Sequence, residues 1–348
     1  MTRASTPSAT SPATSRATPP ATLLLNRSDV MSLLTLPECT DAVEAAFLAH
    51  ATGRSLTPGL LHIEAIGGEF HVKAGGVIMD QQSYFALKAN GGFFGNAASN
   101  GLPNILGVIY LADGSNGFPL AMMDSLYITA LRTGAATAIA ARYLARDDAS
   151  TATICGAGRQ GRIQLRALCN TVALKNAFIW SRNQDHAAAA ASELSSELGI
   201  SVRPAGSLPI ALEQSDVVVT CTPSRKPIIE RSWIAPGTFV AAVGADSPDK
   251  QELDPEILGS ATVFTDITEQ CAHVGELHHA LDRGILTVAN VKAELGDLIS
   301  GRSSGRSSHD EITIFDSTGT ALQDAAAAAL TYEKAIASGR GTMMDFFR

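Results

Sequence analysis

The 348-residue sequence lacks three features that would define common classes of protein. Its five cysteines lie far apart and include no C-x-x-C pair, which argues against a disulfide framework or a zinc knuckle and fits a reducing compartment. No segment approaches the roughly 18 uninterrupted apolar residues that a membrane helix requires. The 26 lysines and arginines are outnumbered by 34 aspartates and glutamates, so the net charge of -8 disfavours nucleic acid as a partner. We therefore expect a cytoplasmic protein that binds neither membranes nor nucleic acid.

Residues 1–22 also lack large side chains. They contain only Ser, Thr, Ala, Pro, two Arg and Met1, a composition that predicts a disordered tail. A transit peptide has a similar composition, but four prolines disfavour its amphipathic helix, so targeting is the less favoured interpretation.

The rest of the chain changes its pattern near residue 150. Before that point, short strand-like runs lie between a predicted helix at 37–50 and another at 126–144. From residue 151, apolar runs alternate with helical patterns, which predicts a parallel sheet with helices on both faces. A Gly-Arg-Ser-Ser repeat predicts a loop at 300–308, and an Ala-rich stretch predicts a last helix at 321–336. The sequence thus indicates an α/β protein of two domains.

The clearest motif is a G-x-G-x-x-G made by Gly156, Gly158 and Gly161, which closes an apolar strand and opens a helix at Arg159 and Gln160. Its glycines allow a tight turn, close approach of a pyrophosphate and packing of helix on strand. Free N–H groups at the start of the helix then hold the phosphates. The motif alone is weak, but its place between strand and helix predicts a dinucleotide site.

The residues that select the cofactor are expected about 20 positions after Gly161. Ser181, Arg182 and Asn183 stand there, and the Asp or Glu that accepts bonds from the ribose of NAD is missing. Donors and a positive charge suit a 2′-phosphate, so we favour NADP, with NAD possible. A solvated surface Arg is the alternative interpretation.

Later strand ends supply further candidates. Thr220 and Thr222 follow a hydrophobic strand and are expected beneath the sugars of the nucleotide, although any parallel strand can end this way. Val243 ends another strand, and Asp246 follows it, where ligands of open parallel sheets bind. A carboxylate there can exchange a proton with a reacting nitrogen, whereas a turn Asp before Ser-Pro is the alternative.

Three cations stand in apolar surroundings. Arg132 lies on a helix too apolar to leave its guanidinium hydrated, so it needs an anion: an internal carboxylate or the carboxylate of a substrate. Lys73 and Lys88 lie on successive predicted strands and would converge beside Arg132 if the strands pair as a hairpin. For either lysine alone, a surface side chain is equally compatible with the sequence.

Four residues near position 275 carry metal-ligand side chains: His273, Glu276, His278 and His279. Their spacing matches neither H-E-x-x-H nor a four-ligand set. We therefore expect no metal site.

With these residues in view, the sequence resembles the ornithine cyclodeaminase and mu-crystallin family, in the family's order across about residues 23–340. The segments that carry the resemblance are Leu87-Lys88-Ala89-Asn90-Gly91, Thr129-Ala130-Leu131-Arg132-Thr133, Gly156-Ala157-Gly158-Arg159-Gln160-Gly161, Val243-Gly244-Ala245-Asp246, Lys250-Gln251-Glu252-Leu253 and Thr313-Ile314-Phe315-Asp316-Ser317-Thr318-Gly319.

This resemblance implies an organisation as well as an activity. It implies a homodimer in which residues 23–131 and 316–348 form an α+β domain for substrate binding and dimerisation. Residues 132–315 would form a Rossmann domain for NAD(P).

The resemblance also implies residue roles. Lys88 and Arg132 would grip a substrate carboxylate, and Asp246 would be the acid/base. A segment of three residues would lie by the nicotinamide: Ser317, Thr318 and Gly319.

The sequence departs from the cyclodeaminases of this family. Those enzymes resemble one another in a Glu-Leu-Met-Pro run before the active lysine, where this chain has His71-Val72-Lys73-Ala74. The Glu that would recognise the second amino group of ornithine is absent, and Lys73 adds positive charge that suits an imino or keto acid.

We therefore predict an NAD(P)H-dependent reductase of a small imino acid, of the pyrroline-2-carboxylate or ketimine type, that gives an L-amino acid such as L-proline. The alternatives are an ornithine cyclodeaminase that releases ammonia and a non-catalytic protein that binds NADPH or a small ligand. The intact set of Lys88, Arg132 and Asp246 argues against the non-catalytic alternative.

Overall fold

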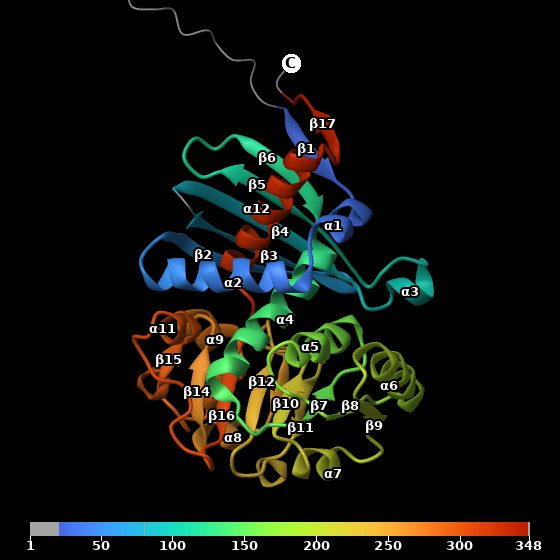
Figure 1. The fold of residues 1–348 in the computed structure, drawn as a ribbon, viewed down its shortest axis with the longest axis vertical. Helices are drawn as coiled ribbons and strands as arrows, with labels where there is room; N and C mark the ends of the chain where they lie inside the picture. The colour runs from blue at the N-terminus through green and yellow to red at the C-terminus, as the bar shows by residue number, and fades with distance from the viewer. Residues whose placement is uncertain (1–20, 80, 347–348) are drawn as a thin grey trace, which may run out of the picture.

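The computed structural model describes residues 21–79 and 81–346, which form two sheets stacked along the long axis of the molecule (Figure 1). Helix α4 (Ser125–Leu144) runs from the first sheet to the second. The predicted tail lies outside the described residues up to residue 20, and Thr22 already begins a strand.

The first sheet has the strand order β17-β1-β6-β5-β4-β3-β2, and we call it, with its helices, the first domain. Neighbouring strands run antiparallel except β1 and β6. Its strands are β1 (Thr22–Leu25), β2 (Ser55–Ala65), β3 (Gly68–Met79), β4 (Gln82–Gly92), β5 (Ile105–Asp113), β6 (Pro119–Asp124) and β17 (Thr342–Met344). Its helices are α1 (Arg27–Leu33), α2 (Leu36–Ala51), α3 (Asn96–Ser99) and α12 (Ala321–Ser338). Because α12 packs on β3 and β4, the C-terminal helix completes the domain built by the N-terminal part of the chain (Figure 1).

Side chains alternate between the two faces of this sheet, as the pleat of a strand requires. On β3, His71 and Lys73 point to the face that α12 covers and are buried, whereas Phe70 points to the other face and is 41% exposed. Lys73 stands directly opposite Lys88 in the β3–β4 register. The predicted hairpin with both lysines on one face is therefore confirmed.

The second sheet contains parallel strands in the order β15-β14-β16-β12-β10-β7-β8-β9 and defines the second domain. Its strands are β7 (Thr151–Cys155), β8 (Asn176–Trp180), β9 (Ser201–Pro204), β10 (Val217–Thr220), β12 (Phe239–Ala242), β14 (Thr262–Thr265), β15 (Ala293–Glu294) and β16 (Thr313–Asp316). A separate pair consists of β11 (Arg225–Ile229) and β13 (Gln251–Leu253). The helices and 3-10 turns are α5 (Arg159–Cys169), α6 (Gln184–Leu198), α7 (Leu208–Glu213), η1 (Arg231–Trp233), α8 (Pro255–Gly259), α9 (Thr268–Val274), α10 (Glu276–Asp282), η2 (Val288–Asn290) and α11 (Leu295–Ile299).

Two hydrophobic cores cover the two faces of the parallel sheet. Val217 and Val219 point into the core shared with α4, α5 and α6, whereas Val218 points into the core shared with α7, α8 and α10. This alternation confirms the predicted α/β architecture, a parallel sheet with helices on both faces.

The predicted helices at 37–50, 126–144 and 321–336 correspond to α2, α4 and α12. The boundary predicted between residues 131 and 132 falls inside α4, which contacts both domains. None of the helices among the described residues is both long enough and apolar enough to cross a bilayer.

Candidate active site

A pocket of about 540 Å³ lies at the carboxyl ends of β7, β8 and β10, over the glycine motif. Gly156 adopts a left-handed φ of 133°, and a Cβ at Gly161 would collide with the carbonyl of Gly156. A side chain at Gly158 would instead project into open space. The motif therefore leaves room for a pyrophosphate against the start of α5, and these residues fit a dinucleotide.

The residues predicted to bind the cofactor fall into two groups. Ser181, Arg182 and Thr222 line the pocket. The side chain of Asn183 instead caps α6 by accepting bonds from two backbone N–H groups, and the hydroxyl of Thr220 is buried. Arg159 and Gln160 begin α5, and Val243 directly follows β12, the strand next to β10; these three do not line the pocket.

Glu252, which the sequence analysis quoted only as part of a motif, supports the floor of this pocket. Its carboxylate accepts bonds from the backbone N–H of Thr222 at 2.6 Å, the hydroxyl of Thr222 at 2.7 Å and the N–H of Gly244 at 3.0 Å. Burial raises the pKa of Glu252 to about 7, although these donors oppose the shift. Glu252 thus fixes two strand ends relative to each other.

The three predicted cations meet in the first domain. Lys73, Lys88 and Arg132 are 3%, 2% and 4% exposed. The common counter-ion of Lys88 and Arg132 is Asp324 on the first turn of α12, which lies 2.6 Å from Nζ of Lys88 and 3.2 Å from Nε of Arg132. The internal carboxylate left open by the sequence is therefore present, and it was not among the predicted site residues.

The cation cluster (Lys73, Lys88 and Arg132) carries more positive charge than its direct carboxylate partner balances. Nη1 of Arg132 also donates to the amide oxygen of Gln323 at 2.9 Å, and Nζ of Lys73 donates to the carbonyl of Thr318 at 2.7 Å. Burial, and then the charge of Arg132, lower the pKa of Lys88 to about 7 despite the opposing attraction of Asp324. Such a cluster favours the binding of an additional anion.

Asp246 joins the cation cluster to the second domain. Its Oδ1 lies 2.7 Å from Nζ of Lys250, and its Oδ2 lies 4.0 Å from Nζ of Lys73. Burial alone would raise the pKa of Asp246, but the charges of Lys250, Lys73 and His71 hold it well below its usual value. Asp246 is therefore an ionised carboxylate over the working pH range of proteins.

The segment predicted to lie by the nicotinamide is anchored by Asp266, another residue that the sequence analysis missed. Oδ2 of Asp266 accepts bonds from the hydroxyl of Ser317 at 3.0 Å and from the N–H of Gly319 at 2.7 Å. Gln270 donates to the hydroxyl of Thr318 at 2.7 Å. Because the carbonyl of Thr318 also binds Lys73, this segment connects the second sheet to the cation cluster.

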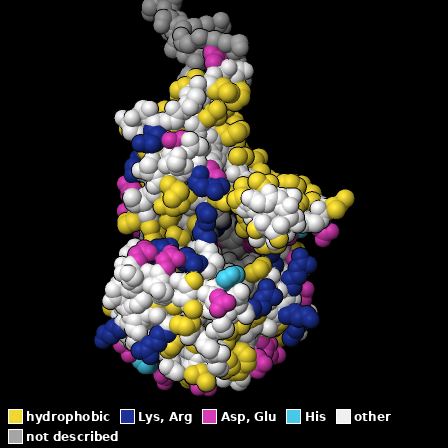
Figure 2. Space-filling view, turned by 90° about the vertical axis from the view of Figure 1, so that its right-hand side faces the viewer, with side chains coloured by type: hydrophobic (Ala, Val, Ile, Leu, Met, Phe, Trp, Pro, Cys, Tyr) yellow, Lys and Arg dark blue, Asp and Glu magenta, His cyan; other side chains and the backbone are white. Residues whose placement is uncertain are grey.

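Figure 2 shows a hollow between the two domains, with Lys and Arg side chains at its edge. The connection between the sites follows from hydrogen bonds. Thr222 of the pocket and Gly244 share Glu252, and Asp246 follows Gly244 by two residues and faces Lys73. The dinucleotide pocket and the cation cluster are therefore linked through the segment that follows β12.

The four residues weighed as metal ligands have separate partners. His278 lies 3.4 Å from Asp282, Nε2 of His279 lies 2.8 Å from the carbonyl of Lys250, and Nδ1 of His273 lies 2.6 Å from the carbonyl of Glu269. The buried carboxylate of Glu276 accepts the backbone N–H groups of β13, its Oε1 that of Glu252 at 2.6 Å and its Oε2 that of Leu253 at 3.1 Å. Each of the four side chains thus has its own contact partner.

The comparisons with known proteins identify relatives of this chain. The model of the ornithine cyclodeaminase/mu-crystallin family matches residues 21–339. Alanine dehydrogenase of Archaeoglobus fulgidus is 39% identical over 328 residues, which cover 94% of this chain and 99% of that protein. A structure of Thermococcus litoralis Δ1-pyrroline-2-carboxylate reductase with NADH and L-proline has a TM-score of 0.87 at 34% identity, over 92% of this chain and 99% of the other. Iminosuccinate reductase of Paracoccus denitrificans with NAD+ has a TM-score of 0.85 at 30% identity, over 94% and 100%.

Proposed function

Because the chain belongs to the ornithine cyclodeaminase/mu-crystallin family and is an NAD(P)-dependent oxidoreductase, we propose that it reduces a small imino acid to an L-amino acid. The single observation that carries this proposal is the buried excess of positive charge opposite Asp246. Lys88 and Arg132 pair with Asp324, and Lys73 faces Asp246 at 4.0 Å, so two carboxylates face three cations. A small substrate with one carboxylate supplies the missing negative charge.

The chain's own groups have distinct roles in this proposal. Arg132 and Lys88, assisted by Lys73, hold the substrate carboxylate and so orient the carbon–nitrogen double bond. The ionised Asp246 stabilises the positive charge on the protonated imine nitrogen. A nicotinamide bound in the pocket would supply the hydride that the imine carbon accepts. The product amine then takes one proton from water to become the ammonium form.

The proposal is tested with a substrate screen. Purified protein is incubated with cyclic ketimines, and with pyruvate or oxaloacetate plus ammonia, while oxidation of NADH and NADPH is followed. Asp246→Asn should abolish turnover and leave cofactor affinity intact, whereas the nearby control Asp249→Asn should retain turnover. Full activity of Asp246→Asn would remove this carboxylate from the mechanism.

We further propose that the enzyme accepts NADPH as well as NADH. The relatives with cofactor in their structures bind NAD+ or NADH. In this chain Arg182, Arg225 and Lys226 line the nucleotide pocket, and no Asp or Glu is among the described residues that line it. A 2′-phosphate would meet positive charge there. Arg182→Asp should therefore lower kcat/KM for NADPH more than for NADH; an equal effect on both would oppose this assignment.

The proposed oligomer is a homodimer formed through the first domain. The sheet face opposite α12 exposes several large apolar side chains: Leu61, Ile63, Phe70, Leu106, Val108 and Met122. An apolar face of this kind is typical of a protein interface, and the archaeal alanine dehydrogenase is a dimer. Light scattering should give a mass of two chains, and Ile63→Asp should shift it toward one. A monomeric parent protein would refute the assignment.

The second candidate function is a cyclodeaminase, in which the cofactor is oxidised and reduced within one turnover. Lys73 argues against the cyclodeaminase function, because the second ammonium group of a diamino substrate would add positive charge next to the cation cluster. Ammonia release from ornithine without net change in the reduced cofactor would support the cyclodeaminase and defeat the reductase.

A further inference from the structure

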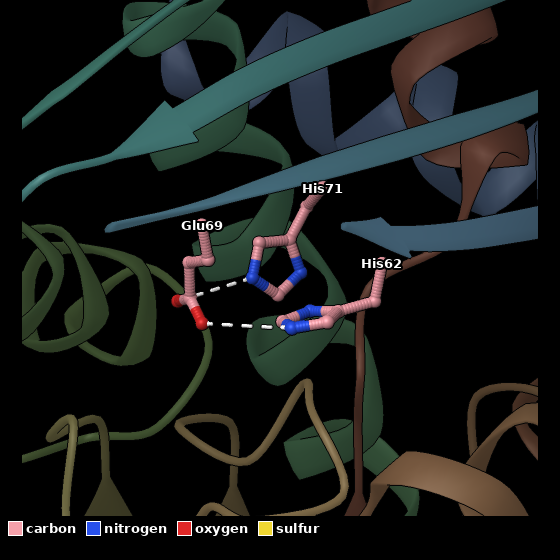
Figure 3. A group of neighbouring side chains, drawn as sticks. All are labelled: His62, Glu69 and His71. Carbon is pink, nitrogen blue, oxygen red and sulfur yellow. Dashed lines mark ion pairs between the residues drawn. The ribbon is translucent and has the colours of Figure 1, made fainter. Parts of the chain in front are cut away.

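A group of His62, Glu69 and His71 lies on β2 and β3, beside the site but outside the proposed chemistry. His62 and His71 are directly opposite in the antiparallel register, and their rings meet edge to face with centroids 4.7 Å apart. Figure 3 shows the carboxylate of Glu69 turned toward both rings. One oxygen lies 3.1 Å from Nε2 of His71, and the other lies 3.9 Å from Nε2 of His62.

We propose that His62, Glu69 and His71 bind one divalent transition-metal ion of the zinc type. Zinc bonds of about 2.0–2.1 Å at tetrahedral angles place two ligand atoms about 3.4 Å apart. The separations of 3.1 and 3.9 Å lie on either side of this value, and one ligand atom from each residue lies within 4.8 Å of the others. Two imidazoles and a carboxylate form the ligand set of many zinc sites with an open fourth position.

The two histidines have ring nitrogens without hydrogen-bond partners, which supports the binding of an ion. His71 is 8% exposed; its Nδ1 has no hydrogen-bond partner, and its Nε2 has only the contact with Glu69 at 3.1 Å. Nδ1 of His62 is also buried without a partner. Buried polar atoms of this kind are uncommon because each loses its contact with water. A bound ion would coordinate one nitrogen of each ring.

The surroundings leave access for an ion and contain an ammonium group that competes with it. A cavity of about 290 Å³, lined by His62 and Glu69, reaches the group and provides space for a water as fourth ligand. Nζ of Lys250 lies 3.5 Å from Oε1 of Glu69 and 2.7 Å from Asp246. An ion would therefore displace this ammonium from Glu69 and leave it paired with Asp246 alone.

The test uses untagged full-length protein that has been treated with a chelator and then dialysed against Zn²⁺ or Co²⁺. We expect one equivalent of ion per chain, and a Co²⁺ visible spectrum typical of tetrahedral nitrogen and oxygen ligands. His62→Ala and His71→Ala should each weaken binding at least about tenfold, since even changes in the groups around metal ligands have effects of that size. Lys250→Met should tighten binding because it removes the competing ammonium.

The matched control is His278→Ala, which removes a histidine in the second domain and should leave binding unchanged. Circular dichroism and NADH binding of each variant check that it is folded. Absence of stoichiometric binding in the parent protein would overturn the proposal, and so would equal binding by the parent protein and the His62→Ala/His71→Ala double variant. An octahedral Co²⁺ spectrum in the parent protein would by itself overturn the proposal of a tetrahedral site.

Discussion

Asp324 is the residue whose replacement tests the charge arrangement most directly. It is fully buried, lies 2.6 Å from Lys88 and 3.2 Å from Arg132, and has nearly the same volume as Asn. Asp324→Asn therefore removes a charge without opening a cavity. We expect the variant to be less stable, because two buried cations lose the carboxylate that balances them.

The magnitude follows from the distances and from the pKa of Lys88. At an effective dielectric constant near 20, unit charges 2.6 Å apart attract by about 6 kcal/mol, and breaking a buried pair by removing one partner costs about 3–5 kcal/mol net. Lys88 can reduce this cost by losing its proton. Its folded pKa of about 7 lies below its unfolded value, so the folded state binds fewer protons between these values and stability rises with pH across them.

In the Asp324→Asn variant the pKa of Lys88 falls further. Just below about pH 7, Lys88 is therefore protonated in the parent protein but not in the variant. The stability deficit of Asp324→Asn should thus be larger near pH 6 than near pH 9, where Lys88 is neutral in both proteins. Urea unfolding followed by circular dichroism at both pH values measures the deficit. Asp282→Asn, on an exposed side chain, is the control. Equal midpoints for parent and variant, or the same deficit at both pH values, would refute the reasoning.

Three further replacements test the buried acids. Burial raises the pKa of Asp316 to about 7, so the folded state binds more protons than the unfolded state between about pH 4 and 7. As the pH rises through this range, the free energy of unfolding therefore falls by up to about 1.4 kcal/mol per pH unit. Asp316→Asn should flatten this slope in unfolding experiments; an unchanged slope would contradict the assignment. Glu252→Gln should weaken NADH binding, measured by fluorescence, about tenfold, because it disturbs the N–H groups of Thr222 and Gly244. Asp266→Ala should lower kcat/KM at least about tenfold with circular dichroism unchanged, and retained activity would show that the segment it anchors needs no such support.

The sequence predicted the parts of the site that depend on local patterns. The glycine motif identified the dinucleotide pocket because strand, turn and helix are contiguous in the chain. Lys73 and Lys88 could be placed on one face because strands alternate and the two strands are neighbours. The predicted cofactor role of Asn183 is less direct, since its side chain caps α6, a use that the same short pattern also permits.

The acids were harder to predict because their partners are distant in the chain. Asp324 is 192 residues from Arg132 and looks, in sequence, like an ordinary acid in the first turn of an Ala-rich helix. Its importance depends on how α12 docks on β3 and β4, which no local pattern specifies. The implied return of the C-terminal helix to the first domain was the available signal, because an acid on the packed face of its first turn would then lie near the buried cations. Asp266 had no comparable signal.

The excess of cations over carboxylates in the cluster would also let the site bind and release an anion, as the proposed function requires. With no carboxylate, burial of the cluster would drive Lys73 and Lys88 to lose their protons, and the charge that attracts the substrate would be lost. With two more carboxylates at Asp324's distance, the three cations would be balanced and would no longer attract another anion. As it stands, a substrate carboxylate stabilises the protonated form of Lys88, whose pKa of about 7 rises on binding. Binding of a small carboxylate above about pH 7 should therefore take up protons, which calorimetry in buffers of different ionisation enthalpy measures; binding without proton uptake there would show that Lys88 does not face the ligand.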